Sequence, residues 1–242
     1  MKLPILRPGI ALPAAETALR DPNGLLAIGG DLSVERLTEA YRNGIFPWFS
    51  DGDPILWWSP DPRAVFLLDQ LRAPASLRRF FRKSGWRLTR NTAFESVIRR
   101  CAETPRTGQA GTWITEAMIA AYIRLHRHGL AHSVEVWDGD SLVGGVYGIA
   151  MGQLFFGESM FSARSNGSKV ALFTLAAHLQ RHGYVLLDSQ VPNPHTTSLG
   201  ASAMPRQAFL TLLRAHRDTP PLGQPWRPGV LNWPETGDRL EP

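Results

Sequence analysis

Residues 133–161 read SVEVWDGDSLVGGVYGIAMGQLFFGESMF, and this stretch decides the fold. It holds three apolar runs separated by two short turn signals of the hairpin type. The runs are residues 133–137, 142–150 and 153–158, and the turns are Asp138-Gly139 and Met151-Gly152. The pattern predicts three consecutive antiparallel strands, because a short hairpin joins neighbours that run in opposite directions.

The segments after and before this stretch predict helices. Residues 116–128 have a helical pattern that stops at Gly129, and residues 169–182 form an apolar helix closed by Gly183. A helix that is apolar nearly all round must pack on a sheet. Another strand, residues 184–187, follows at once. The order helix, three strands, helix, strand predicts an α+β fold with a mainly antiparallel sheet and a β-α-β crossover.

The N-terminal part has a different composition. Ser33 is placed to cap a short helix that Asn43-Gly44 ends. A run rich in Pro and Trp follows, and residues 63–68 then predict a strand. The run predicts no regular element, only an ordered loop or a domain junction, because of its prolines at positions 47, 54, 60 and 62.

Positive charge is concentrated in one segment. The chain has 242 residues and a net charge of +5, yet ten basic residues face two acidic ones between residues 72 and 106. A basic helix is predicted from Pro74 to Gly85, then a strand over residues 86–89, and Thr92 with Glu95 predicts a capping box for the next helix. Such a segment is typical of a surface that binds a polyanion, although a solvated helix face has the same charge.

Composition excludes several classes of protein. Cys101 is the only cysteine, so neither an internal disulfide nor a multi-cysteine metal centre is possible. The longest uncharged stretch, residues 141–157, is interrupted by glycines and too short to span a bilayer. His178 and His182 have the spacing of a zinc pair, but the accompanying Glu of that motif is missing. We therefore expect a soluble, cytoplasmic protein with no membrane partner, no metal and no cofactor.

Polar side chains follow two of the predicted strands. Asp188 comes directly after the strand of residues 184–187 and precedes Ser189 and Gln190, and Glu158 ends another apolar strand. Loops at strand ends on a rigid scaffold often carry catalysis. Two carboxylates on neighbouring strands could orient an amine or accept its proton, provided that they lie close together. The alternative is that each carboxylate only caps a turn.

Seven short motifs of the sequence resemble those of a known family, the leucyl/phenylalanyl-tRNA–protein transferases. The matching motifs run in order from about residue 21 to residue 210. They are Gly24 to Leu32 (GLLAIGGDL), Gly44 to Trp48 (GIFPW), Trp57 to Pro60 (WWSP) with Arg63, Gly111 to Ile114 (GTWI), Gly157 to Phe161 (GESMF), Asp188 to Gln190 (DSQ), and His195 with Ser198 to Ala201 (SLGA). One departure lies at Ser162-Ala163-Arg164, because the family usually places Arg directly after that Ser.

The resemblance implies a fold and a reaction. It implies a small N-terminal domain, residues 1–62, and a larger domain, residues 63–242, with a core like that of the acyl-CoA N-acyltransferases (GNAT-like). The activity implied is transfer of Leu, Phe or less readily Met from aminoacyl-tRNA to the N-terminal Arg or Lys of an acceptor protein, which marks that protein for degradation. Aminoacyl-tRNA and acceptor proteins are the partners implied.

The family reading also implies roles for single residues. Asp188 and Gln190 resemble the pair that orients the acceptor amine and helps to deprotonate it, and Glu158 is expected to meet the acceptor's cationic side chain. Trp113 resembles the residue that stacks on the terminal adenosine. An apolar pocket for the transferred side chain is expected from Val146, Phe155, Met160 and Leu187. Contacts to tRNA phosphates are expected from Arg78, Arg79, Arg82 and Lys83.

Two alternatives stay open from the sequence. The strand and helix order alone also suits an acyl-CoA-dependent N-acyltransferase, although residues 164–169 match its phosphate-binding loop poorly. The Trp and Arg content alone suits an RNA-binding module without catalysis. Such a module has no need of Asp188 or Gln190, so replacing these residues distinguishes it from an enzyme.

Overall fold

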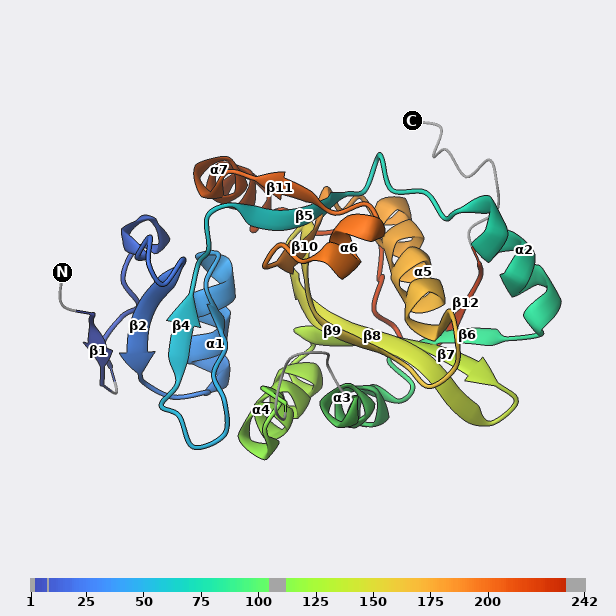
Figure 1. Ribbon diagram of the computed structural model, residues 1–242, viewed down its shortest axis with the longest axis horizontal. Coiled ribbons are helices and arrows are strands. Elements are labelled where there is room, and N and C mark those ends of the chain that lie inside the picture. Colours follow the sequence, from blue (N-terminus) through green and yellow to red (C-terminus); the bar gives the residue numbers. More distant parts are fainter. Residues whose placement is uncertain (1–2, 8, 105–111, 234–242) are drawn as a thin grey trace.

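The computed structural model describes residues 3–7, 9–104 and 112–233, arranged around two β-sheets (Figure 1). The smaller sheet has four strands in the order β1-β2-β4-β3. The strands are β1 (Ile5–Leu6), β2 (Leu25–Gly29), β3 (Phe46–Pro47) and β4 (Leu56–Trp58), accompanied by the short 3-10 helix η1 (Ala15–Thr17) and by helix α1 (Val34–Arg42). We call this part of the chain the N-terminal unit.

Local signals explain α1 but not the strands beside it. Ser33 caps α1, since its side chain accepts a hydrogen bond from the Arg36 amide, and the helix ends at Asn43 as predicted. The prediction of no regular element in the Pro-rich run is wrong, because β3 and β4 lie within it. Pro47 is accommodated at the end of a two-residue strand that pairs on one side only.

The larger sheet has eight strands in the order β11-β5-β10-β9-β8-β7-β6-β12. The strands are β5 (Arg63–Leu67), β6 (Arg87–Arg90), β7 (Ala131–Asp138), β8 (Ser141–Met151), β9 (Leu154–Ser162), β10 (Leu186–Gln190), β11 (Ser202–Met204) and β12 (Gly229–Leu231). Neighbouring strands are antiparallel except β9 and β10, which run parallel. The predicted α+β fold with three consecutive antiparallel strands and a crossover is confirmed.

Helices cover both faces of this sheet (Figure 1). On one face lie α2 (Ala75–Ser84) and the crossover helix α5 (Gly167–Arg181), and on the other lie α3 (Phe94–Glu103) and α4 (Glu116–Arg127). Two further helices follow in the chain, the short α6 (Pro194–Ser198) and α7 (Arg206–His216). Apolar side chains on α5 are buried on nearly all sides, as its composition predicts. None of the helices that the structure describes is both long and apolar enough to cross a membrane.

The predicted capping box at α3 is wrong. Ala93, not Thr92, occupies the N-cap position, and no side chain caps this helix end. The Thr92 hydroxyl instead donates to the buried carboxylate of Glu135 at 3.0 Å. This tertiary hydrogen bond therefore replaces the capping hydrogen bond that the local pattern predicts for Thr92.

Three histidines, in β7 and at the C-terminal end of α5, contact residues 222–226 near the C-terminus. The ring of Trp226 stacks on His132 with centroids 4.3 Å apart and meets His178 edge-on at 5.2 Å. His178 Nε2 and His182 Nδ1 lie 2.8 and 2.7 Å from the carbonyl oxygens of Pro225 and Leu222. The histidines that have the spacing of a zinc pair therefore bind backbone carbonyls.

We expect acid to weaken the fold at this cluster. Burial lowers the pKa of His132 and of His178 from 6.5 to about 3. Because the folded state resists protonation, stability is lost as pH falls below 6.5, on the order of 2 kcal/mol for each imidazole at pH 5. Urea unfolding at pH 7 and pH 5 measures the loss. The variant with His132→Gln and His178→Gln should lose less between the two pH values, and an equal loss in both proteins would contradict the assignment.

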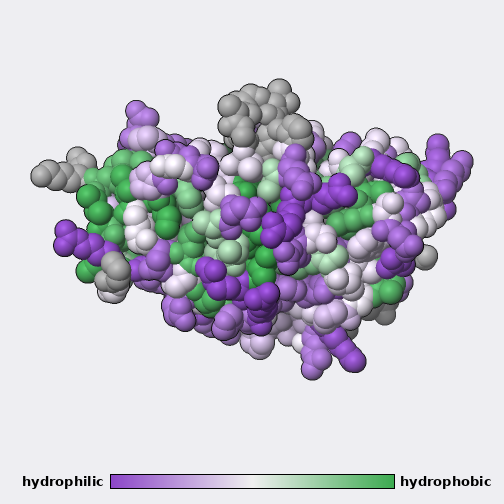
Figure 2. Space-filling view, turned by 90° about the horizontal axis from the view of Figure 1, so that it is seen from below, coloured by the Kyte–Doolittle hydropathy of each residue, from purple (hydrophilic) through white to green (hydrophobic). Residues whose placement is uncertain are grey.

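The surface opposite α5 is mixed in character. Seen from the side of α3 and α4, apolar surface lies over the N-terminal end and in the middle of the face, bordered by hydrophilic side chains (Figure 2). Ile5 and Ile10 are exposed large apolar residues of the N-terminal unit, at 74% and 53%.

Candidate active site

Glu158 occupies a β-bulge in β9. In the pairing with β8, Tyr147 lies opposite Ser159 and Gly148 lies opposite Gly157, so Glu158 is the extra residue between them. A Cβ at Gly148 would lie 2.0 Å from the Phe156 carbonyl oxygen, so only glycine fits beside the bulge. Bulges redirect a side chain out of the regular alternation, and they are common next to active sites.

A second irregularity places Asp188 and Gln190. Strand β10 begins and ends later than predicted, so both residues lie within the strand and not in a loop beyond it. The pairing with β5 shifts between Asp188 and Gln190, and Gln190 has a left-handed φ of 65°. The expectation of a loop site is therefore corrected: the polar side chains extend from two adjacent, irregular strands.

Gln190 connects the two carboxylates. Its side-chain Nε2 donates to Glu158 Oε1 at 2.6 Å, and its backbone amide donates to Asp188 Oδ1 at 2.8 Å. Glu158 and Gln190 are each 8% exposed, whereas Asp188 is fully buried. The structure thus brings together all three residues that the sequence singled out for catalysis.

Asp188 is held by a buried arginine. Arg63, the first residue of β5, donates from Nε to Oδ1 at 2.9 Å and from Nη2 to Oδ2 at 2.6 Å. Both side chains are 0% exposed. With both oxygens engaged by a fork of donors and Oδ1 also accepting the Gln190 amide, Asp188 is fixed in place as half of an ion pair.

The other contacts of Arg63 come from residues 44–46 and from α7. Its Nη1 donates to the Gly44 carbonyl oxygen at 3.1 Å. Its guanidinium carbon lies 4.7 Å from the ring centroid of Phe46 and 4.7 Å from that of Phe209. Arginine packs well against aromatic faces, because its flat, weakly hydrated cation is attracted to their π electrons.

Glu158 has a different environment. Oε1 also accepts a hydrogen bond from Tyr41 on α1 at 2.8 Å, and Oε2 accepts one from Tyr122 on α4 at 3.0 Å. The two tyrosine hydroxyls also lie within hydrogen-bonding distance of each other. Burial raises the pKa of Glu158 from 4.5 to about 7 and the nearby charge of Asp188 also raises it, while the three hydrogen-bond donors partly oppose this rise. Glu158 can therefore exchange a proton near neutral pH.

We call Glu158, Asp188, Gln190, Arg63, Tyr41 and Tyr122 the carboxylate cluster. Reasoning from the sequence missed three roles in it. The sequence gives no role to Tyr41 or Tyr122, and Arg63 enters only as part of a matching motif. A buried Tyr needs a partner for its hydroxyl, which was a usable signal. The sequence contains no signal that pairs Arg63 with a residue 125 positions away.

The four residues expected to form an apolar pocket share one face of the sheet. Val146 lies opposite Met160, and Leu187 lies opposite Phe155, all in the apolar cluster beneath α5. Phe155 and Leu187 are 0% and 1% exposed, so both lie within the core. Met160 is half-buried and is more exposed than the other three residues.

The residues expected to contact RNA lie in two places. Trp113, in the loop before α4, is half-buried and packs against the same apolar cluster as Tyr41 and Tyr122. Helix α2 lies beyond α5, at the end of the molecule away from the N-terminal unit (Figure 1). Its four cations are exposed except for the half-buried Arg78, and among the described residues none of them is ion-paired: Arg78, Arg79, Arg82 and Lys83.

Arg164 stands two positions after Ser162, where the resembling family has its Arg directly after the Ser. Its guanidinium pairs with Asp138 at the turn between β7 and β8, and its side chain is 57% exposed. Arg164 thus contacts a hairpin turn and lies outside the carboxylate cluster.

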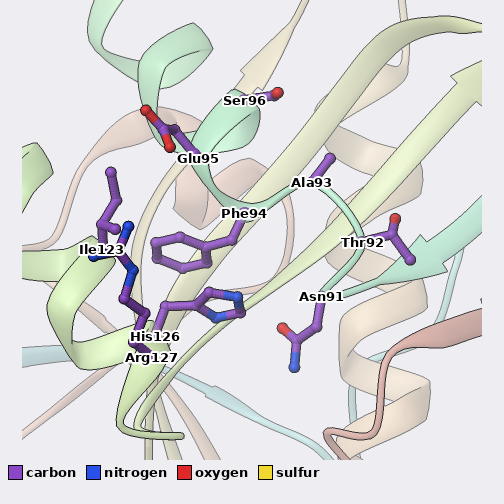
Figure 3. A pocket seen from close by; sticks show the side chains of 9 residues that line it. All are labelled: Asn91, Thr92, Ala93, Phe94, Glu95, Ser96, Ile123, His126 and Arg127. Atoms are coloured by element: carbon purple, nitrogen blue, oxygen red, sulfur yellow. The ribbon is translucent and has the colours of Figure 1, made fainter.

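A separate cavity of about 260 Å³ opens at the start of α3 (Figure 3). The ring of Phe94 stacks on that of His126 at 4.3 Å beside it. None of the residues predicted for catalysis, substrate or tRNA lines this cavity, whose walls are Asn91, Thr92, Ala93, Phe94, Glu95, Ser96, Ile123, His126 and Arg127.

Comparison with known proteins agrees with the motifs. The family model described as leucyl/phenylalanyl-tRNA protein transferase matches residues 65–214, and the model for its N-terminal domain matches residues 30–61. A leucyl/phenylalanyl-tRNA–protein transferase of Xanthomonas axonopodis pv. citri is 58% identical over 90% of this chain and 88% of its own. Relatives of the same name from Pseudomonas fluorescens and a Shewanella species are 58% and 55% identical, over 88% and 91% of this chain and 94% and 93% of theirs.

These matches define the chain as an enzyme of the aminoacyltransferase class. It belongs to the leucyl/phenylalanyl-tRNA protein transferase family. A solved structure, described as L-PGS from Bacillus licheniformis, is similar with a TM-score of 0.39 and 15% identity, over 70% of this chain and 54% of that one. This last likeness is distant.

Proposed function

We propose that this enzyme transfers Leu, Phe or less readily Met from aminoacyl-tRNA to the α-amine of an N-terminal Arg or Lys, marking the acceptor protein for degradation in the cytoplasm. The observation that carries the proposal is the carboxylate cluster, in which a buried acid with a pKa of about 7 is hydrogen-bonded to Gln190. Family membership supports the same activity.

The proposed reaction is aminolysis of an ester. The acceptor's amine nitrogen attacks the carbonyl carbon of the aminoacyl ester, a C–N bond forms, and the C–O bond to the terminal ribose of the tRNA breaks. The amine gives up a proton, and the departing ribose oxygen takes one. Because the ester is already activated, holding amine and carbonyl together supplies much of the rate.

We assign the proton acceptor to Glu158. An α-amine has a pKa of about 7.7 to 8.0, and a general base works best with a pKa near the working pH. Glu158 meets this condition with a pKa of about 7. Asp188 is fixed by Arg63, so in this proposal it positions Gln190, whose side chain orients the amine. Glu158 is thereby assigned to the amine and not, as expected from the sequence, to the acceptor's cationic side chain.

We further propose that residues 63–242 form a GNAT-like core and residues 1–62 a separate domain. In support, the four-stranded sheet is built from residues 5–58 and the eight-stranded sheet starts at Arg63. Trp113 would stack on the terminal adenosine, and Val146, Phe155, Met160 and Leu187 would shape the apolar site for the transferred side chain. No metal or cofactor is required in this proposal.

The decisive experiment uses labelled Leu-tRNA and a protein with N-terminal Arg. Controls are a protein with N-terminal Ala and a donor treated with RNase. Label on the Arg protein alone, and only with intact tRNA, is the expected result. If folded enzyme gives no label under any condition, the proposed reaction is wrong, and acetyl-CoA and RNA binding assays decide between the two alternatives.

We expect α2 to carry the non-specific part of tRNA binding. The variant with Arg79→Glu, Arg82→Glu and Lys83→Glu should bind tRNA more weakly and with less dependence on salt. Each phosphate contact contributes about −0.7 to −0.9 to the slope of log K against log salt, so losing three should flatten it by about 2 to 3. Filter binding across a salt series measures this.

The control for α2 reverses two exposed arginines of the N-terminal unit, Arg7→Glu and Arg20→Glu. It changes net charge without touching α2, and its salt slope should stay near that of the unmodified enzyme. Equal slopes in the α2 variant and the unmodified enzyme would make α2 an ordinary solvated helix.

A further inference from the structure

One short segment of the N-terminal unit contacts one carboxylate of the cluster directly and is linked to the other through Arg63. Tyr41 donates directly to Glu158, and three residues later the Gly44 carbonyl accepts from Arg63, which in turn holds Asp188. Gly44 has a φ of +73°, and a Cβ there would lie 2.7 Å from Leu210 and 3.0 Å from Phe209. The turn that ends α1 is thus pressed against α7 and fits only as glycine.

Arg63 connects this segment to the larger sheet. It is fully buried, and its three nitrogens donate hydrogen bonds to the Asp188 carboxylate and the Gly44 carbonyl oxygen. Its guanidinium group packs against the rings of Phe46 in β3 and Phe209 in α7. Lysine could keep the charge, but it has one nitrogen and no fork, so it could not hold Asp188 by two bonds and reach Gly44 as well. The arrangement therefore depends on guanidinium geometry as well as on charge.

We propose that Arg63 is a positioning residue for the transfer reaction: it couples the docking of residues 41–46 to the placement of Asp188, and through Asp188 to that of Gln190. The inference rests on the proposed function of the carboxylate cluster. Asp188 accepts the backbone amide of Gln190, so movement of the carboxylate displaces the strained, left-handed residue that orients the amine. Displacements of about 1 Å in such a site cost on the order of 100-fold in rate.

The test is Arg63→Lys, with Arg36→Lys as its matched control. Arg36 is also a buried arginine, 7% exposed and ion-paired with Glu39 on α1. Steady-state transfer rates at several Leu-tRNA concentrations separate kcat from KM. For Arg63→Lys we expect kcat to fall on the order of 100-fold with KM for Leu-tRNA within about threefold, because the tRNA-binding surface is untouched. Arg36→Lys should leave both constants near their original values.

A second variant covers the case in which Arg63→Lys does not fold. Phe209→Leu keeps the ion pair and removes one of the two rings on the guanidinium, and it should lower kcat by a smaller factor, again with KM unchanged. Full kcat in a folded Arg63→Lys protein overturns the inference. So does a fall in kcat that comes with an equal rise in KM, or full kcat in Phe209→Leu when Arg63→Lys cannot be folded.

Failure of the proposed function is recognised separately. If the unmodified enzyme transfers no Leu, the reaction assignment fails, and amide hydrogen exchange then tests the coupling alone. Arg63→Lys should speed exchange at residues 44–46 more than in α4, because the bond to the Gly44 carbonyl is lost. Unchanged exchange at residues 44–46 would overturn the coupling as well.

Discussion

Glu158→Gln is expected to lower the rate of Leu transfer at pH 7.5 by at least about 100-fold, the usual contribution of a general base. Gln has the same shape, its amide oxygen can still accept a hydrogen bond from one of the two tyrosines and its NH2 group can donate to the other hydroxyl, but it cannot take up a proton. The loss should appear in kcat, because the proton that the amine gives up as it attacks the ester no longer has an acceptor. Single-turnover assays with labelled Leu-tRNA measure the effect, and Glu116→Gln, an exposed glutamate of α4, is the control.

The pH profile tests the same assignment. With a pKa of about 7, Glu158 becomes ionised as pH rises through neutrality, so the rate of the unmodified enzyme should climb between about pH 6 and pH 8. The acceptor amine loses its proton in a similar range and adds to the climb. In Glu158→Gln only the amine contribution should remain. A profile identical in shape to that of the unmodified enzyme would return Glu158 to the role of partner for the acceptor's side chain.

Folding stability gives an independent check. Because the pKa of Glu158 is raised in the folded state, folded protein binds its proton more tightly than unfolded protein does. The contribution is favourable at low pH and is lost as pH rises from 4.5 to about 7, by on the order of 3 kcal/mol. Urea unfolding of Glu158→Gln should lack this loss.

Asp188→Ala is expected to abolish transfer and to destabilise the fold by about 3–5 kcal/mol. The sequence identifies Asp188 only as a candidate for catalysis, which by itself predicts no loss of stability. The structure changes this, because removing Asp188 leaves the fully buried Arg63 guanidinium without its anion. A charge left unpaired in the interior is among the most destabilising single changes.

Urea unfolding and single-turnover transfer together measure both effects. Asp138→Ala is the matched control, since it breaks an ion pair with the exposed Arg164 and should cost no more than about 1 kcal/mol. A folded, fully active Asp188→Ala enzyme would reject the whole site assignment. Equal losses of stability in the two variants would show that the Arg63–Asp188 pair does not act as a buried one.

Prediction from the sequence succeeded where the signal is local. Ser33 caps α1 and Gly85 ends α2, and the three strands from residue 131 to residue 162 follow the apolar runs that predict them. Prediction failed where contacts with distant parts of the chain determine the local structure. The Thr92 side chain binds Glu135 and does not cap the N-terminus of α3. The Pro-rich run forms strands because other strands of the N-terminal sheet pair with them.

The sequence by itself determined the α+β class, the basic helix α2 and the candidate catalytic residues Glu158, Asp188 and Gln190, because periodicity, charge and short motifs are properties of adjacent residues. Only the tertiary structure decided what those residues can do. Arg63 meets Asp188 across 125 positions and Tyr41 meets Glu158 across 117, and the two bulges that aim the carboxylates arise from strand register. Register and burial are set by the packing of the whole chain, and they are what raise the pKa of Glu158 and fix Asp188 in its ion pair.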